Sequence, residues 1–384
     1  MPMSPSPLPM AEDAGAILTI DLDALVANWR YLATHTTARQ AAAVVKADAY
    51  GLGAAQVVPA LVVAGCRLFF VAHLAEALAI RPLLPDGAQV AVLNGLMPSA
   101  EPACAAANVL PVLNSPDQAR RWQAHAQALG RPLPAMLQLD IGMARLGLSL
   151  DQAGAMAADS AFAQMVPLQA VLGHLACADD PADPANAAQL AAFRAGAVLF
   201  PGVPRSLANS AASLNDARFH GDILRPGLAL YGAQPVTDAR HPIRPVISLQ
   251  ARVIQTRDVI DGTGAGYGLT WRADGPRRLA TLAVGYADGW PRSLSERGAA
   301  WWNGHDLPIA GRVSMDSTII DITALPLEAL RAGDLVELIG PHRPIEQVAA
   351  QAGTIAYEIL TGLGHRYTRR YLPLAVPNPQ EIAA

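Results

Sequence analysis

Lysine is almost absent from this chain of 384 residues: of its 28 lysine and arginine side chains, all but Lys46 are arginine. Either residue serves as a surface cation, so the single exception indicates a task that only an amine performs. A guanidinium stays protonated in proteins, whereas a lysine amine can lose its proton, act as a base and form a Schiff base. The alternative is a buried ion pair between Lys46 and Asp48.

Cysteine is scarce as well. The three cysteines, Cys66, Cys104 and Cys177, lie far apart and form no CxxC pair. This pattern favours neither a disulfide framework nor a zinc site, and it is typical of a reducing compartment. The first basic residue is Arg30, so the positively charged start of a secretory signal is missing. We therefore expect a soluble, cytoplasmic protein.

Long uninterrupted apolar runs and a strong excess of one charge are also missing. The uncharged stretch over residues 49–66 approaches the length of a membrane span, but Gly51, Gly53, Gln56 and Pro59 interrupt it. The formal net charge of −4 gives no electrostatic reason to expect nucleic acid or an anionic membrane as partner.

Short apolar runs alternate with Ala-rich stretches of helical spacing over the first 245 residues. Eight such runs predict a closed parallel (β/α)8 barrel, a TIM barrel, whereas a doubly wound sheet would carry a GxGxxG after its first strand, which is missing. The predicted strands are 42–46, 67–72, 89–93, 109–113, 135–140, 168–174, 205–209 and 223–225, and a helix over 22–36 precedes them.

From about Pro245 the segments become short, β-branched and separated by Gly, Pro and Asp, which indicates an antiparallel β domain. A helical stretch over 345–363 and a basic segment over 366–370 follow. The sequence therefore predicts an α/β protein with a disordered N-terminal extension (1–15), a barrel (16–245) and a mainly antiparallel C-terminal β domain (246–384).

Chemically capable side chains follow the predicted barrel strands, where the C-terminal rim of such a barrel carries its active site. Lys46 ends the first strand and His174 the sixth. The loops after strands seven and eight, where barrels commonly bind a phosphate, offer polar groups and a closely approachable backbone. A lysine nucleophile, a phosphate site and an inward arginine together are typical of a pyridoxal-phosphate site. The residues are Lys46, Tyr50, Asp140, Arg145, His174, Asn209, Ser210, Arg225 and Gly227.

The segments KADAYG, RPGLALYG, GYADG and GRVSMD occur in this order over nearly the whole chain, which resembles the alanine racemase family. The resemblance implies a fold-type III pyridoxal-phosphate enzyme that interconverts L- and D-alanine and supplies D-alanine for peptidoglycan. It also implies a head-to-tail homodimer in which each β domain contributes to the partner's active site.

The resemblance implies roles for residues of the barrel. Lys46 would form the Schiff base and act as one of two catalytic bases. Arg225 would face the pyridine nitrogen, Arg145 the phenolic oxygen, and His174 would flank the ring. Groups on the phosphate would be Tyr50, Ser210, Gly227 and, from the β domain, Tyr357; the loop after the seventh strand adds Asn209 as a further candidate for binding the cofactor.

In the β domain, the resemblance makes Tyr267 the second base, contributed by the partner subunit. Met315 and Asp316 would contact the substrate carboxylate region together with Arg145. Tyr286 and Arg292 would line the entry route. An amine and a phenol both titrate near pH 10, so each needs a lowered pKa to act as a base.

The sequence departs from the family pattern at two positions before Arg145. Many members carry a lysine, modified to a carbamate, where this chain has Gln138, and a neutral amide supplies no negative charge to orient Arg145. Either the amide oxygen orients it or a bound anion such as chloride does. Ala144 stands where glycine is common, which lowers backbone freedom.

Three other readings compete. A broad-specificity amino acid racemase shares the fold, but such relatives tend to be exported and disulfide-bonded. A non-catalytic pyridoxal-phosphate-binding protein would resemble the barrel alone. A fold-type III decarboxylase is expected to carry a cysteine in its C-terminal domain, and no cysteine follows Cys177.

Overall fold

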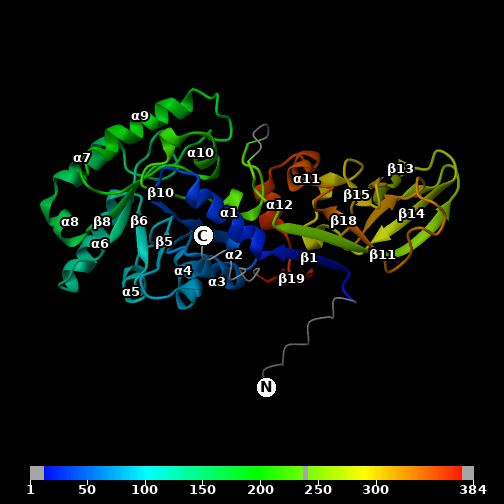
Figure 1. Ribbon diagram of the computed structural model, residues 1–384, viewed down its shortest axis with the longest axis horizontal. Helices are drawn as coiled ribbons and strands as arrows, with labels where there is room; N and C mark the ends of the chain where they lie inside the picture. The colour runs from blue at the N-terminus through cyan, green and yellow to red at the C-terminus, as the bar shows by residue number, and fades with distance from the viewer. Residues whose placement is uncertain (1–12, 237–240, 374–384) are drawn as a thin grey trace, which may run out of the picture. The chain divides into compact units, whose positions relative to one another are not determined.

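The chain folds as two units. One comprises residues 25–244, and the other comprises the chain up to Ala24 together with residues 245–384. The computed structural model describes residues 13–236 and 241–373 (Figure 1). Of the extension predicted over residues 1–15, residues 1–12 lie outside the described part. Ala14 and Gly15 belong to the fold, because their carbonyl groups accept hydrogen bonds from Arg252, at 2.8 Å each.

The unit over residues 25–244 is a parallel barrel, as predicted. Seven strands pair in parallel in chain order: β3 (Ala43–Val44), β4 (Leu68–Val71), β5 (Gln89–Val92), β6 (Leu110–Leu113), β7 (Ala135–Gln138), β8 (Leu168–Leu172) and β9 (Arg205–Ser206).

An eighth strand, β10 (Ile223–Leu224), closes the barrel. It pairs in parallel with β2 (Gln40–Ala41), which precedes β3, and the Ala42 N–H donates to the Leu224 carbonyl at 3.0 Å. On its other side, the Arg225 N–H donates to the Ala208 carbonyl beside β9, also at 3.0 Å. The strands are buried on both faces, which explains their continuous apolar runs; Phe69, Phe70 and Val71 of β4 are at most 1% exposed.

Helices alternate with these strands, and local sequence sets several of their starts. Ser115 caps α6 through the Gln118 N–H, and Asp159 caps α8 through two backbone amides. The helices of this region are α1 (Leu22–Thr34), α2 (Lys46–Tyr50), α3 (Ala54–Ala64), α4 (Leu74–Ile80), α5 (Glu101–Ala106), α6 (Pro116–Ala128), α7 (Leu150–Ala158), α8 (Ser160–Met165), α9 (Ala185–Ala197) and α10 (Ser210–Asn215).

The second unit is built on an 8-stranded, mainly antiparallel sheet whose order is β16-β15-β18-β11-β1-β19, with β14 paired to β11 and β17 to β14. Its first strand, β1 (Ala16–Asp21), pairs antiparallel with β11 (Ile247–Val259) and parallel with β19 (Thr368–Leu372). This corrects the assignment of residues 16–24 to the barrel: the residues next in sequence to the barrel pair with strands more than 200 positions away.

The remaining strands of this unit are β12 (Gly264–Ala265), β13 (Trp271–Arg272), β14 (Arg277–Leu282), β15 (Ala299–Trp302), β16 (His305–Pro308), β17 (Thr318–Asp321) and β18 (Leu335–Ile339). The single helix predicted over 345–363 is two helices, α11 (Ile345–Ala352) and α12 (Ala356–Gly362), because Gly353 adopts a left-handed φ of 72° and ends the first. Across residues 13–236 and 241–373, every helix is too short or too polar to cross a membrane.

Candidate active site

Lys46 stands where the first barrel strand ends and begins a turn of unusual hand. The four residues that follow it, Ala47 to Tyr50, have φ values between 53° and 56°, in the left-handed region. Each such non-glycine residue costs about 1–2 kcal/mol relative to a right-handed conformation, so surrounding contacts must hold the turn. Burial lowers the pKa of the Lys46 amine; Arg145 lowers it further, and Glu76 opposes both effects.

The predicted alternative, a buried ion pair between Lys46 and Asp48, does not form. The Asp48 carboxylate instead accepts the Ala54 N–H at 2.7 Å and so supports the start of α3. In the described part of the chain, Lys46 makes no ion pair with an acid. The amine is therefore left for chemistry, with its protonation already disfavoured.

Arg225 lies buried at the end of β10, 5% exposed, and is held by neutral acceptors. Its guanidinium donates to the Ser206 carbonyl at 2.8 Å, to the Ser206 Oγ at 2.6 Å and to the Gly173 carbonyl at 2.6 Å. Burial lowers the pKa of Arg225 to about 10. Within the described residues Arg225 forms no ion pair with an acid, so its charge stays uncancelled.

His174, at the end of β8, is held neutral. Burial lowers its pKa to about 3, and the nearby charges of Arg225, Arg145 and Lys46 lower it as well. The structure therefore gathers these four predicted residues within electrostatic reach of one another. A site with this much positive potential is suited to an anionic ligand.

The loops after β9 and β10, where the sequence predicts a phosphate site, contact each other. Asn209 caps α10, and the Ser210 Oγ accepts the N–H groups of Gly227 at 2.9 Å and Ala229 at 3.2 Å. Tyr50 approaches the same backbone so closely that a Cβ on Gly227 would lie 2.2 Å from the Tyr50 hydroxyl oxygen. A side chain at position 227 would therefore force Tyr50 or the local backbone to move.

Arg145 lies on the loop after β7, which Asp140 organises. One carboxylate oxygen of Asp140 accepts the N–H groups of Gly142, Met143 and Ala144 at 3.0–3.2 Å. Ala144 has a φ of 55°, so this chain places an alanine where the backbone favours glycine. Gln138 is buried, 7% exposed, and its side-chain nitrogen donates to the Leu146 carbonyl at 3.3 Å.

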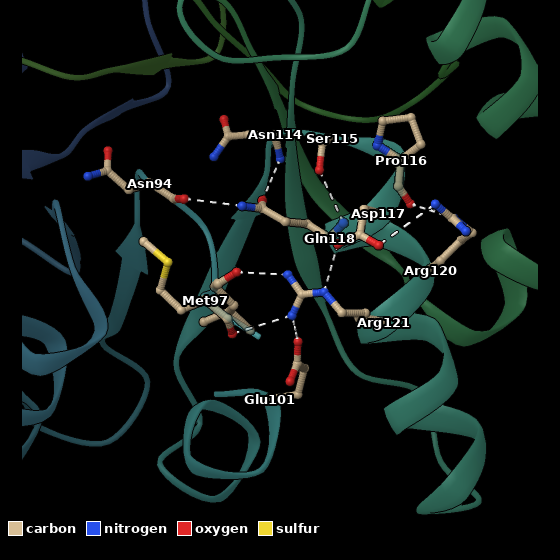
Figure 2. A network of polar contacts seen from close by, with 11 residues as sticks. Asn94, Met97, Glu101, Asn114, Ser115, Pro116, Asp117, Gln118, Arg120 and Arg121 are labelled. Carbon is tan, nitrogen blue, oxygen red and sulfur yellow. Dashed lines mark hydrogen bonds and ion pairs between the residues drawn. The ribbon is translucent and has the colours of Figure 1, made fainter. Parts of the chain in front are cut away.

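A polar network fixes the neighbouring loops of the rim (Figure 2). Arg121 reaches from α6 to the main chain after β5, where it donates to the Leu96 carbonyl at 2.9 Å, and it pairs with Glu101. The Gln118 Oε1 accepts the Asn114 N–H at 2.9 Å. The Asn114 carbonyl in turn accepts the Gly147 N–H at 3.2 Å, which ties this network to the loop of Arg145.

The second unit presents Tyr267 at the tip of the β12–β13 hairpin, where the side chain is 70% exposed. Gly266 precedes it with a φ of 68°, and a Cβ there would lie 3.1 Å from the Arg312 nitrogen. The hairpin thus packs on Gly311 and Arg312, at the start of the GRVSMD segment that also contains Met315 and Asp316.

Met315 is 52% exposed, and the GYADG turn holds its loop: the Ala287 N–H donates to the Met315 carbonyl at 3.0 Å. Arg366 links this loop to the interior. It donates to both carboxylate oxygens of buried Asp288, at 2.5 and 2.8 Å, and to Asp316 at 2.7 Å. Side-chain hydrogen bonds to these two acids raise the pKa of Arg366.

Tyr357, on α12, is 38% exposed, and Tyr286 is 41% exposed; both belong to the same unit as Tyr267. The sequence analysis did not single out Arg366 or Glu76. Arg366 was read as part of a basic segment, and nothing local reveals that its partners are Asp288 and Asp316. Glu76 lies three residues after His73, where a capping box usually has Ser or Thr. The sequence pattern of a capping box, which would have pointed to Glu76, is therefore missing.

Comparison with known proteins covers both units. Residues 20–235 match the alanine racemase N-terminal domain, and residues 246–371 match the alanine racemase C-terminal domain. The chain belongs to the alanine racemase family. The match to the second domain disfavours a protein that resembles the barrel alone.

Relatives in the family are similar over nearly their full length. The catabolic alanine racemase of Agrobacterium fabrum is 53% identical over 362 residues, which cover 94% of this chain and 93% of that protein. The alanine racemase of Brucella canis is 49% identical, covering 95% and 97%. The crystal structure of the Bartonella henselae alanine racemase, which has covalently bound pyridoxal phosphate, superposes with a TM-score of 0.90 at 43% identity, covering 94% of this chain and 100% of that one.

Proposed function

We propose that this chain interconverts L- and D-alanine with pyridoxal phosphate as cofactor, and that Lys46 holds the cofactor covalently. The observation that carries the proposal is the position of the only lysine. It begins a strained turn at the barrel rim, its pKa is lowered, and Arg145, Arg225 and His174 act on the same site. When bound, pyridoxal phosphate withdraws electrons from the Cα of the amino acid and makes its proton acidic.

The residues at the rim fit this anionic group. The Ser210 hydroxyl, the Tyr50 hydroxyl and the backbone at Gly227 converge on the proposed phosphate site, with Asn209 capping the helix that follows. Arg145 supplies a cation for the phenolic oxygen. Arg225 would face the ring nitrogen, and because its pKa remains about 10 it donates hydrogen bonds there without giving up its proton at neutral pH.

Racemisation needs a proton removed from one face of Cα and returned on the other. Lys46 serves one face, and its lowered pKa leaves more of the amine unprotonated at neutral pH. We infer that Tyr267 of the partner subunit serves the other face in a head-to-tail homodimer. Its 70% exposure at the tip of a hairpin suits a side chain that completes a second subunit's site. Met315, Asp316 and Tyr357 would contribute from the same domain, with Tyr286 and Arg292 along the entry route.

The cofactor assignment is tested by borohydride reduction followed by peptide mapping. Label should appear on Lys46. Lys46→Arg keeps the charge but leaves no lysine in the chain, so it should retain no label outside the α-amino terminus. Label on the wild-type terminus with an unmodified Lys46 would overturn the assignment.

The substrate is tested by chiral chromatography after incubation with a panel of L-amino acids. Alanine should be inverted without release of carbon dioxide. Comparable inversion of serine, lysine or arginine would indicate a broad-specificity racemase, and carbon dioxide release a decarboxylase.

The role of Tyr267 is tested with Tyr267→Phe. The variant should wash deuterium into D-alanine through Lys46, while interconversion falls roughly two to four orders of magnitude. Mixing it with Lys46→Ala subunits should restore activity, since one site of the heterodimer then has both bases. Tyr31→Phe, which alters a tyrosine stacked on His35 in α1, should retain full activity. Proven heterodimers that stay inactive would place both bases in one chain.

The cellular role belongs to the same proposal. We propose a cytoplasmic enzyme that supplies D-alanine for peptidoglycan; the Agrobacterium relative, by contrast, is named as a catabolic enzyme. All three cysteines are free, which suits a reducing compartment.

A further inference from the structure

Glu76 joins the ends of two neighbouring barrel strands through one carboxylate. Its Oε2 accepts the N–H groups of Ala72 at 2.7 Å and His73 at 3.0 Å, where β4 ends and α4 begins. Its Oε1 accepts the Ala47 N–H at 2.6 Å, at the residue directly after Lys46. A glutamate that only capped α4 would need Oε2 alone. Here Oε1 also accepts a hydrogen bond from the turn that carries the lysine.

That turn needs an external anchor. Four successive left-handed residues, Ala47 to Tyr50, are strained, and Ala47 is the first of them. The far end is held, since the Asp48 carboxylate accepts the Ala54 N–H and the Tyr50 ring stacks on Tyr231 with centroids 4.5 Å apart. At the near end, the side chain that holds the turn is Glu76. A hydrogen bond from a backbone amide to an ionised acceptor contributes about 1.5–3 kcal/mol, comparable to the strain of one or two such residues.

We propose that Glu76 is a positioning residue for Lys46: by holding the Ala47 amide, its carboxylate fixes the start of the left-handed turn and so the direction of the lysine side chain. The proposal rests on the assignment of Lys46 as the cofactor lysine. It gives Glu76 no contact with substrate or cofactor, because within the described residues its carboxylate accepts hydrogen bonds from backbone amides alone.

The charges around Lys46 give the proposal a second readout. Arg145 acts on Lys46 from the loop after β7, His174 follows β8, and Arg225 directly follows β10. Asp48, within the turn, is occupied by Ala54. Of the side chains that act on the pKa of Lys46, Arg145 lowers it and Glu76 raises it. Removing the Glu76 charge while keeping the shape of the side chain should therefore lower that pKa.

The experiment compares full-length Glu76→Ala and Glu76→Gln with a matched control. Asp159→Ala removes another carboxylate that accepts two backbone amides, those of Ala161 and Phe162, at the start of α8. Because Lys46 is the only lysine, cofactor-free protein labelled with ¹³Cε-lysine gives a single ε-carbon resonance whose titration reports its pKa directly. Thermal midpoints, cofactor affinity, kcat and the KM for alanine are measured in parallel.

All three variants should lose thermal stability to a similar degree. Glu76→Gln should lower the pKa of Lys46. Glu76→Ala should weaken cofactor binding and lower kcat about 10- to 100-fold, with the KM for alanine changed less than about twofold, because a displaced lysine affects the reacting geometry. Asp159→Ala should leave the pKa of Lys46, the cofactor affinity, kcat and the KM for alanine at wild-type values.

If both Glu76 variants behave like Asp159→Ala, Glu76 is only a helix cap and the proposal is overturned. Should Glu76→Ala fail to fold, the near-isosteric Glu76→Gln decides by the Lys46 titration and by kcat. If borohydride leaves wild-type Lys46 unlabelled, the proposed function fails, whereas the resonance of the cofactor-free chain still reports whether Glu76 acts on Lys46.

Discussion

Gly227→Ala tests the phosphate site through one steric contact. The added methyl carbon would lie 2.2 Å from the Tyr50 hydroxyl oxygen and 2.9 Å from the Cζ of its ring, against ordinary contacts near 3.4–4 Å. The φ of Gly227 is −123°, outside the left-handed region, so the contact with Tyr50 is what the substitution tests. Tyr50 cannot swing away cheaply: it is 5% exposed and stacks on Tyr231, whose hydroxyl is anchored to the Val44 carbonyl at 2.8 Å.

Overpacking of this kind costs about 1–3 kcal/mol. Because both residues face the proposed cofactor site, that cost should appear as a loss of pyridoxal-phosphate affinity of about 5- to 150-fold, measured by equilibrium titration. In a Tyr50→Phe background the nearest atom is gone, so Gly227→Ala should cost at least about 0.5 kcal/mol less. Gly154→Ala is the control. Apart from its chain neighbours and the backbone of α7 itself, no described atom lies within 4 Å of its added methyl group, so it should leave affinity unchanged.

Wild-type affinity in Gly227→Ala, or strict additivity with Tyr50→Phe, would refute the reasoning. It would show either that the Tyr50 ring moves freely or that this backbone does not face the cofactor.

Three further predictions follow from the same rim. Ala144→Gly should raise stability by about 0.5–1 kcal/mol, because relief of a φ of 55° exceeds the entropic cost of glycine; an unchanged denaturation midpoint would contradict it. Removing dissolved carbon dioxide should leave activity unchanged, since Gln138 has no amine to form a carbamate; a carbon dioxide requirement in a racemase assay would contradict the role given to this position. The pKa of His174 falls to about 3 from an unfolded value near 6.5, so it contributes stability above pH 6.5 that is lost as pH falls towards 3. His174→Asn should therefore flatten the acid loss of thermal stability, and an unchanged slope between pH 7 and pH 4 would show that His174 is protonated in the fold.

The barrel could be predicted from the sequence because its signal is local. All eight predicted runs became strands, and the most buried of them, such as β4, are the continuous apolar runs that a parallel sheet requires. The place of β1 could not be predicted this way. Its apolar run fits any sheet, and the choice of β11 and β19 as partners depends on contacts between distant parts of the chain.

In the candidate site, too, the features with a local sequence signal could be predicted and those that depend on tertiary contacts could not. Lys46, His174, Ser210 and Arg225 were predicted from where strands end, and the structure brings them to one rim. The left-handed turn after Lys46 was not predicted, because alanine and aspartate carry no local preference for four such residues in succession. Contacts outside the turn hold it, among them the hydrogen bond from the Ala47 N–H to the carboxylate of Glu76, which comes from the next β/α unit.

The hydrogen-bond acceptors around Arg225 are all neutral, which explains why this rim favours an anionic ligand. A buried guanidinium is usually stabilised by an acid, yet Arg225 is held by two carbonyl groups and the Ser206 hydroxyl. These neutral acceptors satisfy its hydrogen-bond donors but do not neutralise its charge. With a pKa of about 10, the protonated form exceeds the neutral form by about a thousandfold at pH 7. An acid in place of Ser206 would cancel that charge before any ligand arrived. The fold instead accepts the cost of an uncompensated cation beside Lys46 and Arg145, and a phosphorylated, anionic cofactor is the group that offsets it.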